Sequence, residues 1–400
     1  MIDKNSSSCL ADRWLSTLSD LNVCSQKGLV ERFDSTIGAA SVLLPFGGKY
    51  QATPAECMVA KLPVTEGFTT AGTVMSHGYN PRLSRWSPFH GALYAVIEAV
   101  AKIVASGGDH HQIRLTLQEY FERVGTDPLR WGKPFSALLG ALTAQQKLGI
   151  AAIGGKDSMS GTFKDMHVPP TLVAFALAPV DVSKVISPEF KRIGSTVLLV
   201  SVARDEQEMP DFAQLDKAYS VINTMINDGK VLSAHTVKSG GVAEAVSKMS
   251  FGNRIGMQFE DFIDEELLFS ADIGSIVLEI KEGVDYRKEF AGITVKNLGV
   301  TIENRLIRVN GIDLNIDELQ EYWEKPLEKV FPTRASIIKD VKEAKLYTER
   351  SKVTPRVKIA RPRVLISVFP GTHCEYDSER AFRKAGAVCD TFVLKNLSPS

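Results

Sequence analysis

The sequence has little of several features that would identify a class of function directly. Its five cysteines are scattered through 400 residues, without a Cys-x-x-Cys pair or a metal-spaced His/Cys cluster, so zinc is not predicted and reduced thiols are favoured. The N-terminal segment lacks the apolar stretch of a signal peptide, and no apolar run approaches the roughly 20 residues that span a bilayer. We therefore expect a cytoplasmic protein that does not act in a membrane.

Neither sign of charge is in excess. Lys plus Arg and Asp plus Glu both total 47, so the formal net charge is zero. Such a balance gives no electrostatic reason to expect binding to nucleic acid or to an anionic membrane. The apolar fraction of 44% and the length of 400 residues are typical of globular material in two or three domains.

The most informative segment present is residues 154–163, Gly-Gly-Lys-Asp-Ser-Met-Ser-Gly-Thr-Phe, which follows the apolar run 150–153. Two glycines after a strand free the backbone amides to face an anion. Lys156 adds a positive charge, Asp157 can hold Mg²⁺, and Ser158 offers a hydroxyl. The pattern is not a P-loop, because no Gly-x4-Gly-Lys-Ser/Thr is present. It predicts phosphate and magnesium chemistry, with a plain turn as the alternative.

Apolar periodicity predicts the main elements. Helices are expected over residues 90–106, 134–148 and 213–228, and strands over 113–117, 150–153, 172–177 and 197–202. Pro134 would occupy the first turn of the second helix. The buried stripe of that helix would consist of Phe135, Leu138, Leu139, Leu142 and Leu148.

The pattern of predicted secondary structure changes at residue 361. A strand at 363–369, a helix at 376–385 and a strand at 388–394 make one β-α-β unit, the opening of a doubly wound domain. One such unit cannot build a two-faced core, because parallel strands need neighbours and covering helices. We therefore expect that the chain is cut within this domain.

Together these motifs resemble the phosphoribosylformylglycinamidine synthase family, the large glutamine-dependent ligases of purine biosynthesis. The matching segments are residues 28–38, 87–91, 118–121, 131–134, 154–163, 168–172 and 370–377. The last of them, Pro370-Gly-Thr-His-Cys-Glu-Tyr-Asp377, is similar to the start of the family's glutaminase domain. The resemblance extends over essentially the whole chain, in the order second synthetase repeat, linker, glutaminase start.

The resemblance implies a fold of mixed α+β and α/β class. It is a second AIR-synthetase-like repeat, with an N-type and a C-type domain, followed by a truncated, flavodoxin-like β-α-β start of the glutaminase. The implied boundaries are 1–182 for the N-type domain, 183–324 for the C-type domain, 325–360 for the linker and 361–400 for the class I glutamine amidotransferase fragment.

The resemblance also implies an activity. The family uses ATP to phosphorylate the amide oxygen of formylglycinamide ribonucleotide, and ammonia from glutamine then displaces phosphate, with Mg²⁺ neutralising the phosphoryl charge. This chain would be an incomplete ATP- and glutamine-dependent carbon–nitrogen ligase without catalytic residues of its own. It would need the missing first synthetase half and the rest of the glutaminase domain. The alternative is a catalytically inactive scaffold or nucleotide-binding module with the same fold.

Carried over residue by residue, the family's nucleotide contacts fall on one segment and one strand end. Gln118 and Glu119 would follow a strand whose end, like residues 154–163, faces the boundary between the two synthetase halves. The implied ATP-binding residues are Gly155, Lys156, Asp157, Ser158, Gln118 and Glu119, with Asp157 also a magnesium ligand.

A second, non-catalytic nucleotide site in the family holds ADP and magnesium ions. The resemblance places Glu56 and Glu98 at its acidic metal-ligand positions. The alternative for Glu98 is a surface ion pair with Lys102, four residues further along the same helix. Lys102 stands where an asparagine ligand is expected, Thr236 where an aspartate ligand is expected, and Lys238 at a serine that contacts the nucleotide. Because an ammonium group cannot coordinate magnesium, our hypothesis is that this site has lost its metal cluster, with lysines partly supplying the positive charge.

One further motif suggests a rival function. Residues 373–380 contain the His-Cys-x5-Arg pattern of a cysteine phosphatase loop, with Cys374 as the thiol. Three acidic residues in the same segment oppose phosphate binding and raise the pKa of a thiol, so a phosphatase is disfavoured. The family's glutaminase nucleophile lies on a later strand-turn-helix elbow, so Cys374 is not expected to fill that role either.

Overall fold

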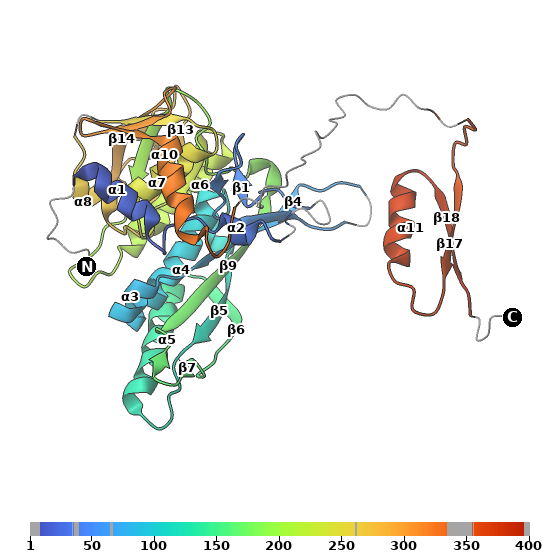
Figure 1. Ribbon diagram of the computed structural model, residues 1–400, viewed down its shortest axis with the longest axis horizontal. Coiled ribbons are helices and arrows are strands. Elements are labelled where there is room, and N and C mark those ends of the chain that lie inside the picture. Colours follow the sequence, from blue (N-terminus) through green and yellow to red (C-terminus); the bar gives the residue numbers. More distant parts are fainter. Residues whose placement is uncertain are drawn as a thin grey trace. The chain divides into compact units, whose positions relative to one another are not determined.

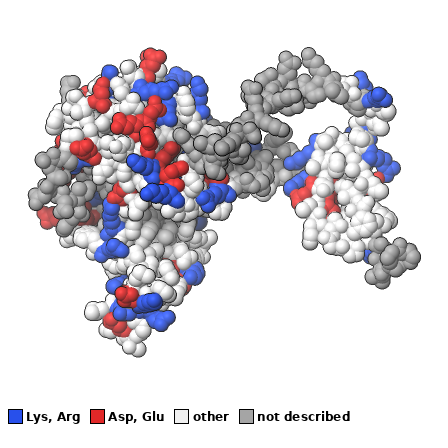
Figure 2. Space-filling model, viewed as in Figure 1, with Lys and Arg blue, Asp and Glu red and all other residues white. Residues whose placement is uncertain are grey.

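The computed structural model describes residues 9–33, 35, 40–64, 67–260, 262–333, 354 and 356–395. The chain divides into two compact units, Met1–Ser336 and Ile337–Ser400, and each is considered by itself. On the visible face of the larger unit, basic and acidic side chains are interspersed (Figure 2), as the zero net charge predicts.

The first sheet of the larger unit has five strands in the order β3-β4-β9-β5-β6. They are β3 (Met58–Lys61), β4 (Ala71–Gly78), β5 (Arg114–Tyr120), β6 (Ala151–Lys156) and β9 (Thr171–Asp181). All neighbours are antiparallel except β5 and β6. Because β5 and β6 are parallel, their C-terminal ends meet at the same end of the sheet.

Two long helices accompany this sheet (Figure 1). α4 (Pro88–Ala105) packs on β4 and β9, and α5 (Pro128–Leu148) packs against α4. Ser87 and Asp127 cap the two N-termini through their side chains, and each is followed by a proline that suits the first helical position. α4 has the length and composition of a membrane span, yet 83% of it is buried inside the protein, which is the arrangement of a core helix.

The second sheet has seven strands in the order β11-β13-β10-β14-β12-β15-β16, antiparallel except for β12 and β15. They are β10 (Thr196–Val200), β11 (Val231–Thr236), β12 (Gly256–Phe259), β13 (Ile276–Ile280), β14 (Val295–Ile302), β15 (Leu306–Val309) and β16 (Ile312–Asn315). The helices of this half are α1 (Leu10–Ser19), α6 (Phe212–Asn227), α7 (Gly241–Phe251), α8 (Glu265–Phe269), α9 (Tyr286–Glu289) and α10 (Ile316–Glu324).

Short elements complete the larger unit. They are α2 (Lys27–Val30), α3 (Pro81–Trp86), β1 (Phe46–Gly47), β2 (Thr53–Pro54), β7 (Thr162–Phe163), β8 (Met166–His167), and the 3-10 turns His110–Gln112, Val182–Lys184 and Lys325–Leu327.

Two hydrophobic clusters hold the larger unit together. The first surrounds α4 and extends from the first sheet to α6, β11 and β13. Fifteen residues of α4 are buried, because the helix packs on elements of both sheets. The second cluster joins the second sheet to α1, α7 and α10, with Trp14 and Trp323 fully buried in it.

The smaller unit is the β-α-β unit that the sequence predicts. β17 (Arg363–Val368) and β18 (Val388–Val393) are parallel, and α11 (Glu375–Lys384) connects them. Leu365 and Phe392 are 68% and 57% exposed, so large apolar side chains of both strands are uncovered in this unit. Its identification as the start of a glutaminase stays a prediction.

The predicted boundary at residue 182 falls between the two sheets, since β9 ends at Asp181 and β10 begins at Thr196. α1, although first in the chain, packs against α7 and α10 beside the second sheet. The three predicted domain boundaries, after residues 182, 324 and 360, stay predictions. Part of the 325–360 linker and part of the 28–38 motif lie outside the described residues.

The prediction for α5 is wrong in two respects. The helix begins at Pro128, so Pro134 lies inside it and not in its first turn. Its buried face consists mostly of small residues, while Phe135, Leu138, Leu139 and Leu142 are 42–64% exposed. The close approach of α4 explains this, because a Cβ added at Gly140 would lie 2.0 Å from the carbonyl oxygen of Phe89.

Candidate functional site

The C-terminal ends of β5 and β6 bring together the residues predicted to bind nucleotide. Gln118 pairs with Lys156 in the parallel ladder, and Glu119 is the next residue of β5. Asp157 and Ser158 come directly after β6. We call Gln118, Glu119, Lys156, Asp157 and Ser158 the edge cluster.

Gly154 and Gly155 lie within a strand, although the sequence predicted that they would follow one. β6 runs through Gly154 and Gly155 to Lys156, and β5 includes Gln118 and Glu119, which the prediction had placed after the strand. A Cβ added at Gly155 would lie 2.4 Å from the carbonyl oxygen of Leu117. The close approach of the two strands therefore requires glycine at this position.

The edge cluster is accessible to a ligand. Lys156 and Asp157 are exposed, and Ser158 and Gln118 are half-buried. The segment is held in place by the backbone, since Phe121 N donates to the Ser158 carbonyl oxygen at 2.9 Å. These side chains are therefore not enclosed in the hydrophobic core.

Glu119 is the buried member of the edge cluster, with 4% of its surface exposed. Its Oε1 atom has no hydrogen-bond partner among the described residues. Burial, and then the negative charge of Asp157, raises the pKa of Glu119 to about 7. Two carboxylates that repel each other offer the hard oxygen ligands that Mg²⁺ prefers, so these residues fit a divalent cation.

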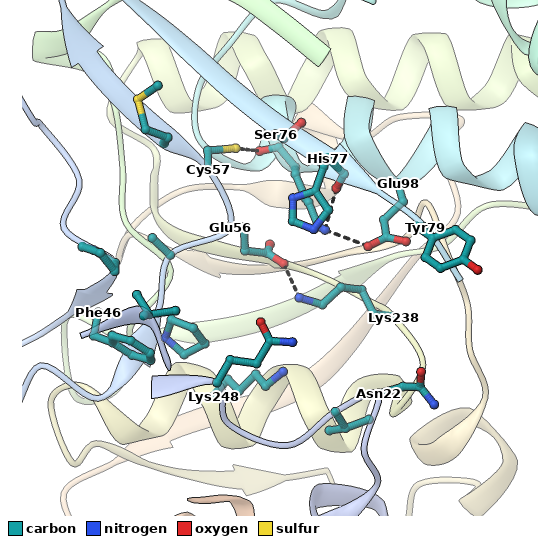
Figure 3. A pocket seen from close by; sticks show the side chains of 18 of the residues that line it. Asn22, Phe46, Glu56, Cys57, Ser76, His77, Tyr79, Glu98, Lys238 and Lys248 are labelled. Atoms are coloured by element: carbon teal, nitrogen blue, oxygen red, sulfur yellow. Dashed lines mark hydrogen bonds and ion pairs between the residues drawn. The ribbon is translucent and has the colours of Figure 1, made fainter. Parts of the chain in front are cut away.

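A second group of charged residues surrounds a cavity of about 1000 Å³ in the larger unit (Figure 3). Each of three buried carboxylates forms an ion pair with a lysine. The pairs are Glu56–Lys238 at 2.8 Å, Glu98–Lys102 at 2.7 Å and Glu244–Lys248 at 2.5 Å, and we call them the paired cluster. Glu98 and Lys102 both lie on α4, and Glu244 and Lys248 both lie on α7. The third pair joins Glu56, between β2 and β3, to Lys238, which follows β11.

Glu56 is held by several donors at once. The backbone N–H and the hydroxyl of Thr236 donate to its two oxygens, each at 2.7 Å. Burial opposes ionisation of Glu56, but the charges of His235 and Lys238 lower its pKa below the usual value. Burial also lowers the pKa of His235 to about 4, and its Nδ1 donates to the Thr236 carbonyl oxygen at 2.8 Å.

The structure brings together the five residues that the sequence assigned to a second nucleotide site. Glu56, Glu98, Lys102, Thr236 and Lys238 are all buried or lie at the cavity, but the two glutamates bind lysines. The metal-ligand role of Glu56 and Glu98 stays a prediction.

Sequence reasoning missed Glu244, Lys248 and His235 as residues beside this cavity. Glu244 and Lys248 lie four residues apart on α7, a spacing that normally marks an exposed ion pair. The apolar residues that surround them in the sequence were the available sign of burial.

Cys374 is exposed at the N-terminus of α11, in a left-handed conformation with φ 67°. Arg380, which a phosphatase loop would direct at a phosphate, forms an ion pair with Asp377 at 2.7 Å. Glu375 and Asp377 occupy the first turn of the helix. The smaller unit therefore gives no support to a phosphatase.

No protein-family model matches the chain. Curated relatives are phosphoribosylformylglycinamidine synthase subunits named PurL. The subunit of Thermoplasma acidophilum is 24% identical over 352 residues, which cover 78% of this chain and 44% of the relative. The subunit of Picrophilus torridus is 27% identical over 349 residues, 79% of this chain and 44% of the relative. The chain thus spans less than half the length of these relatives.

Solved structures agree in fold. PurL of Thermotoga maritima, in a complex with FGAR, matches with a TM-score of 0.60 at 13% identity, over 88% of this chain and 57% of that one. The same protein in a complex with ADP matches with a TM-score of 0.58 at 14% identity, over 86% and 56%. The chain has a PurL-like fold. This likeness confirms the predicted combination of mixed sheets with helices, while the second repeat, its N-type and C-type domains, the glutaminase part and the large, fused form stay predictions.

Proposed function

We propose that the larger unit is the second synthetase half of an ATP-dependent ligase that makes formylglycinamidine ribonucleotide from formylglycinamide ribonucleotide. The edge cluster carries the proposal. On a PurL-like fold, at the adjoining ends of two parallel strands, it brings together an exposed lysine, an exposed and a buried carboxylate and a half-buried hydroxyl. PurL structures in complexes with ATP, ADP and FGAR support the proposal that this chain binds an adenine nucleotide and formylglycinamide ribonucleotide.

Each residue of the edge cluster has a proposed task. Lys156 contacts phosphate oxygens of ATP, and Ser158 contacts phosphate or substrate through its hydroxyl. Asp157 and Glu119 would hold Mg²⁺, which when bound neutralises charge on the phosphoryl group. Gln118 lies beside them at the same strand end. Positioning and charge neutralisation are the main contributions that a protein makes to phosphoryl transfer.

The proposal extends to partners. The chain would work with a first synthetase half that completes the nucleotide and substrate surface. The β-α-β unit supports a glutaminase domain that supplies ammonia from glutamine, because its two strands need further neighbours and covering helices. We further propose a cytoplasmic location.

Calorimetric titration with Mg-ATP tests the edge cluster. Asp157→Ala should weaken binding at least tenfold, since it removes a ligand of the cation that bridges protein and phosphates. Asp165→Ala is the matched control, because Asp165 is also exposed and lies between β7 and β8, outside the cluster. A folded Asp157→Ala variant with unchanged affinity would contradict the assignment of Asp157.

A second measurement separates the ligase from an inactive scaffold of the same fold. The complete protein that contains this chain should release ADP only when formylglycinamide ribonucleotide and an ammonia source are both supplied. Binding of Mg-ATP with no such turnover would favour the scaffold.

A further inference from the structure

The family resemblance implies metal ions near Glu56 and Glu98, but the residues around the cavity do not fit a metal cluster. We propose that this cavity excludes divalent cations, because the three lysines of the paired cluster act as fixed counter-ions of its carboxylates. The proposal concerns a different place from the edge cluster and stands independently of the proposed function.

The first reason is that both oxygens of Glu56 already accept hydrogen bonds, three in all. Oε1 accepts from the Thr236 hydroxyl and from Lys238 Nζ at 2.7 and 2.8 Å, and Oε2 accepts from the Thr236 N–H at 2.7 Å. Figure 3 shows Lys238 reaching Glu56 beside the cavity. A cation on the same oxygen would have to displace the ammonium group, which has no lone pair and cannot become a ligand.

The second reason is that Lys102 cannot easily leave Glu98. Its Nζ donates to Glu98 Oε1 at 2.7 Å and to the His77 carbonyl oxygen at 2.8 Å. Both side chains are almost completely buried, at 7% and 9% exposure. Moving the ammonium aside would leave a buried charge and a backbone acceptor without partners.

The third reason is the balance of charge. Glu244 accepts from the backbone N–H of Gly240 at 2.8 Å and pairs with Lys248, so it too is occupied. The paired cluster contains three carboxylates and three ammonium groups. A divalent cation bound to these buried carboxylates would add two uncompensated charges and would give up part of its hydration shell.

A titration with Mn²⁺, followed by electron paramagnetic resonance, tests this exclusion directly. Wild type and Glu56→Gln should bind the same number of ions with the same affinity, because none of them lies in the cavity. Asp157→Ala reports separately on the edge cluster. Ions that persist in Asp157→Ala and are lost in Glu56→Gln would overturn the proposal. If the wild type binds no Mn²⁺, the result agrees with the exclusion of cations from the cavity and contradicts only the cation site proposed for the edge cluster.

Removal of a lysine should open the cavity to metal. In the Asp157→Ala background, Lys238→Met should lower the unfolding midpoint in EDTA, and excess Mg²⁺ should restore several degrees. The control Lys147→Met, at an exposed position, should unfold at the same midpoint with and without Mg²⁺. If the Lys238→Met midpoint does not respond to Mg²⁺, the counter-ion role is wrong.

A charge-balanced variant guards against loss of folding. Glu56→Gln combined with Lys238→Met keeps the cavity neutral and should unfold at the same temperature in EDTA and in Mg²⁺. A rise of its midpoint in Mg²⁺, again in the Asp157→Ala background, would show a cation site that does not need Glu56 and would contradict the exclusion.

Discussion

The edge cluster and the paired cluster use carboxylates in opposite ways. At the edge, burial, and then the negative charge of Asp157, raises the pKa of Glu119 to about 7. Around the cavity, each carboxylate has a lysine, and the pKa values of Glu56 and Glu244 are lowered although burial opposes this. The ionised form of Glu119 is disfavoured because no internal cation compensates it, so an external cation that supplies the missing charge can bind there. An acid with an internal ammonium partner lacks this need.

The difference has a consequence for acid stability. A raised carboxyl pKa means that the folded state binds a proton that the unfolded chain has released, so Glu119 makes folding less favourable as the pH rises from about 4.5 towards 7. His235, beside Glu56, has a lowered pKa and acts in the opposite direction. The two regions therefore contribute pH slopes of opposite sign.

The largest expected effect breaks the paired cluster. Lys102→Met leaves Glu98 charged and buried without its partner, and should reduce the free energy of unfolding by about 3–5 kcal/mol, as measured in urea. The combination with Glu98→Gln removes both charges and should recover most of this loss. If the single and double variants are equally unstable, packing and not charge pairing holds this part of α4.

A smaller effect is expected at the strand ends that carry the edge cluster. Gly155→Ala places a methyl group 2.4 Å from the Leu117 carbonyl oxygen, so β5 and β6 must separate, at a cost of roughly 1–3 kcal/mol in urea unfolding. Gly154→Ala is the matched control, since a Cβ there meets nothing within 4 Å. Equal stability of the two variants would show that the strands yield freely.

The smallest effect concerns the pH slope of the paired cluster. The pKa of His235 is about 4 in the folded state and 6.5 when unperturbed, so the unfolded chain binds one proton more between these values. This group therefore raises the free energy of unfolding with pH by up to about 1.4 kcal/mol per pH unit over that window, and the contribution is lost as the pH falls through it. His235→Gln should reduce the slope measured in urea at pH 4.5 and 6.0. An unchanged slope would place the titration elsewhere, for example at His77, whose pKa is also lowered to about 4.

The sequence predicted which functional residues lie near one another better than it predicted the interactions that these residues form. Residue types and order located Lys156 and Asp157 at a strand end, and the resemblance placed Glu56, Glu98 and Lys238 around one cavity, as the structure shows. The two pairs within α4 and α7 have the i,i+4 spacing of an ordinary exposed ion pair, so the sequence did not reveal their burial. The Glu56–Lys238 pair could not be predicted from the residues alone, because its members are 182 residues apart.

α5 shows why the buried face of a helix was misjudged. Large apolar residues usually mark the buried side, and Phe135 and Leu138 suggested one. Where two helices approach closely, however, the contact selects small residues such as Gly140 and Ala141, and the larger ones face outwards. The periodicity of apolar residues indicates in which direction one face of a helix points, but not how closely a neighbouring helix approaches that face.

The position of α4 also restricts how this protein can change over generations. A helix that is packed on two sheets has no tolerant side where substitutions accumulate singly. A Cβ at Gly274, for instance, would lie 2.9 Å from the Ile97 side chain, so a larger residue at 274 demands a smaller one at 97, besides the backbone strain that its φ of 103° imposes. Among related sequences, positions of α4 should therefore vary in concert with residues from both halves of the larger unit, which an alignment of close homologues would reveal as covariation.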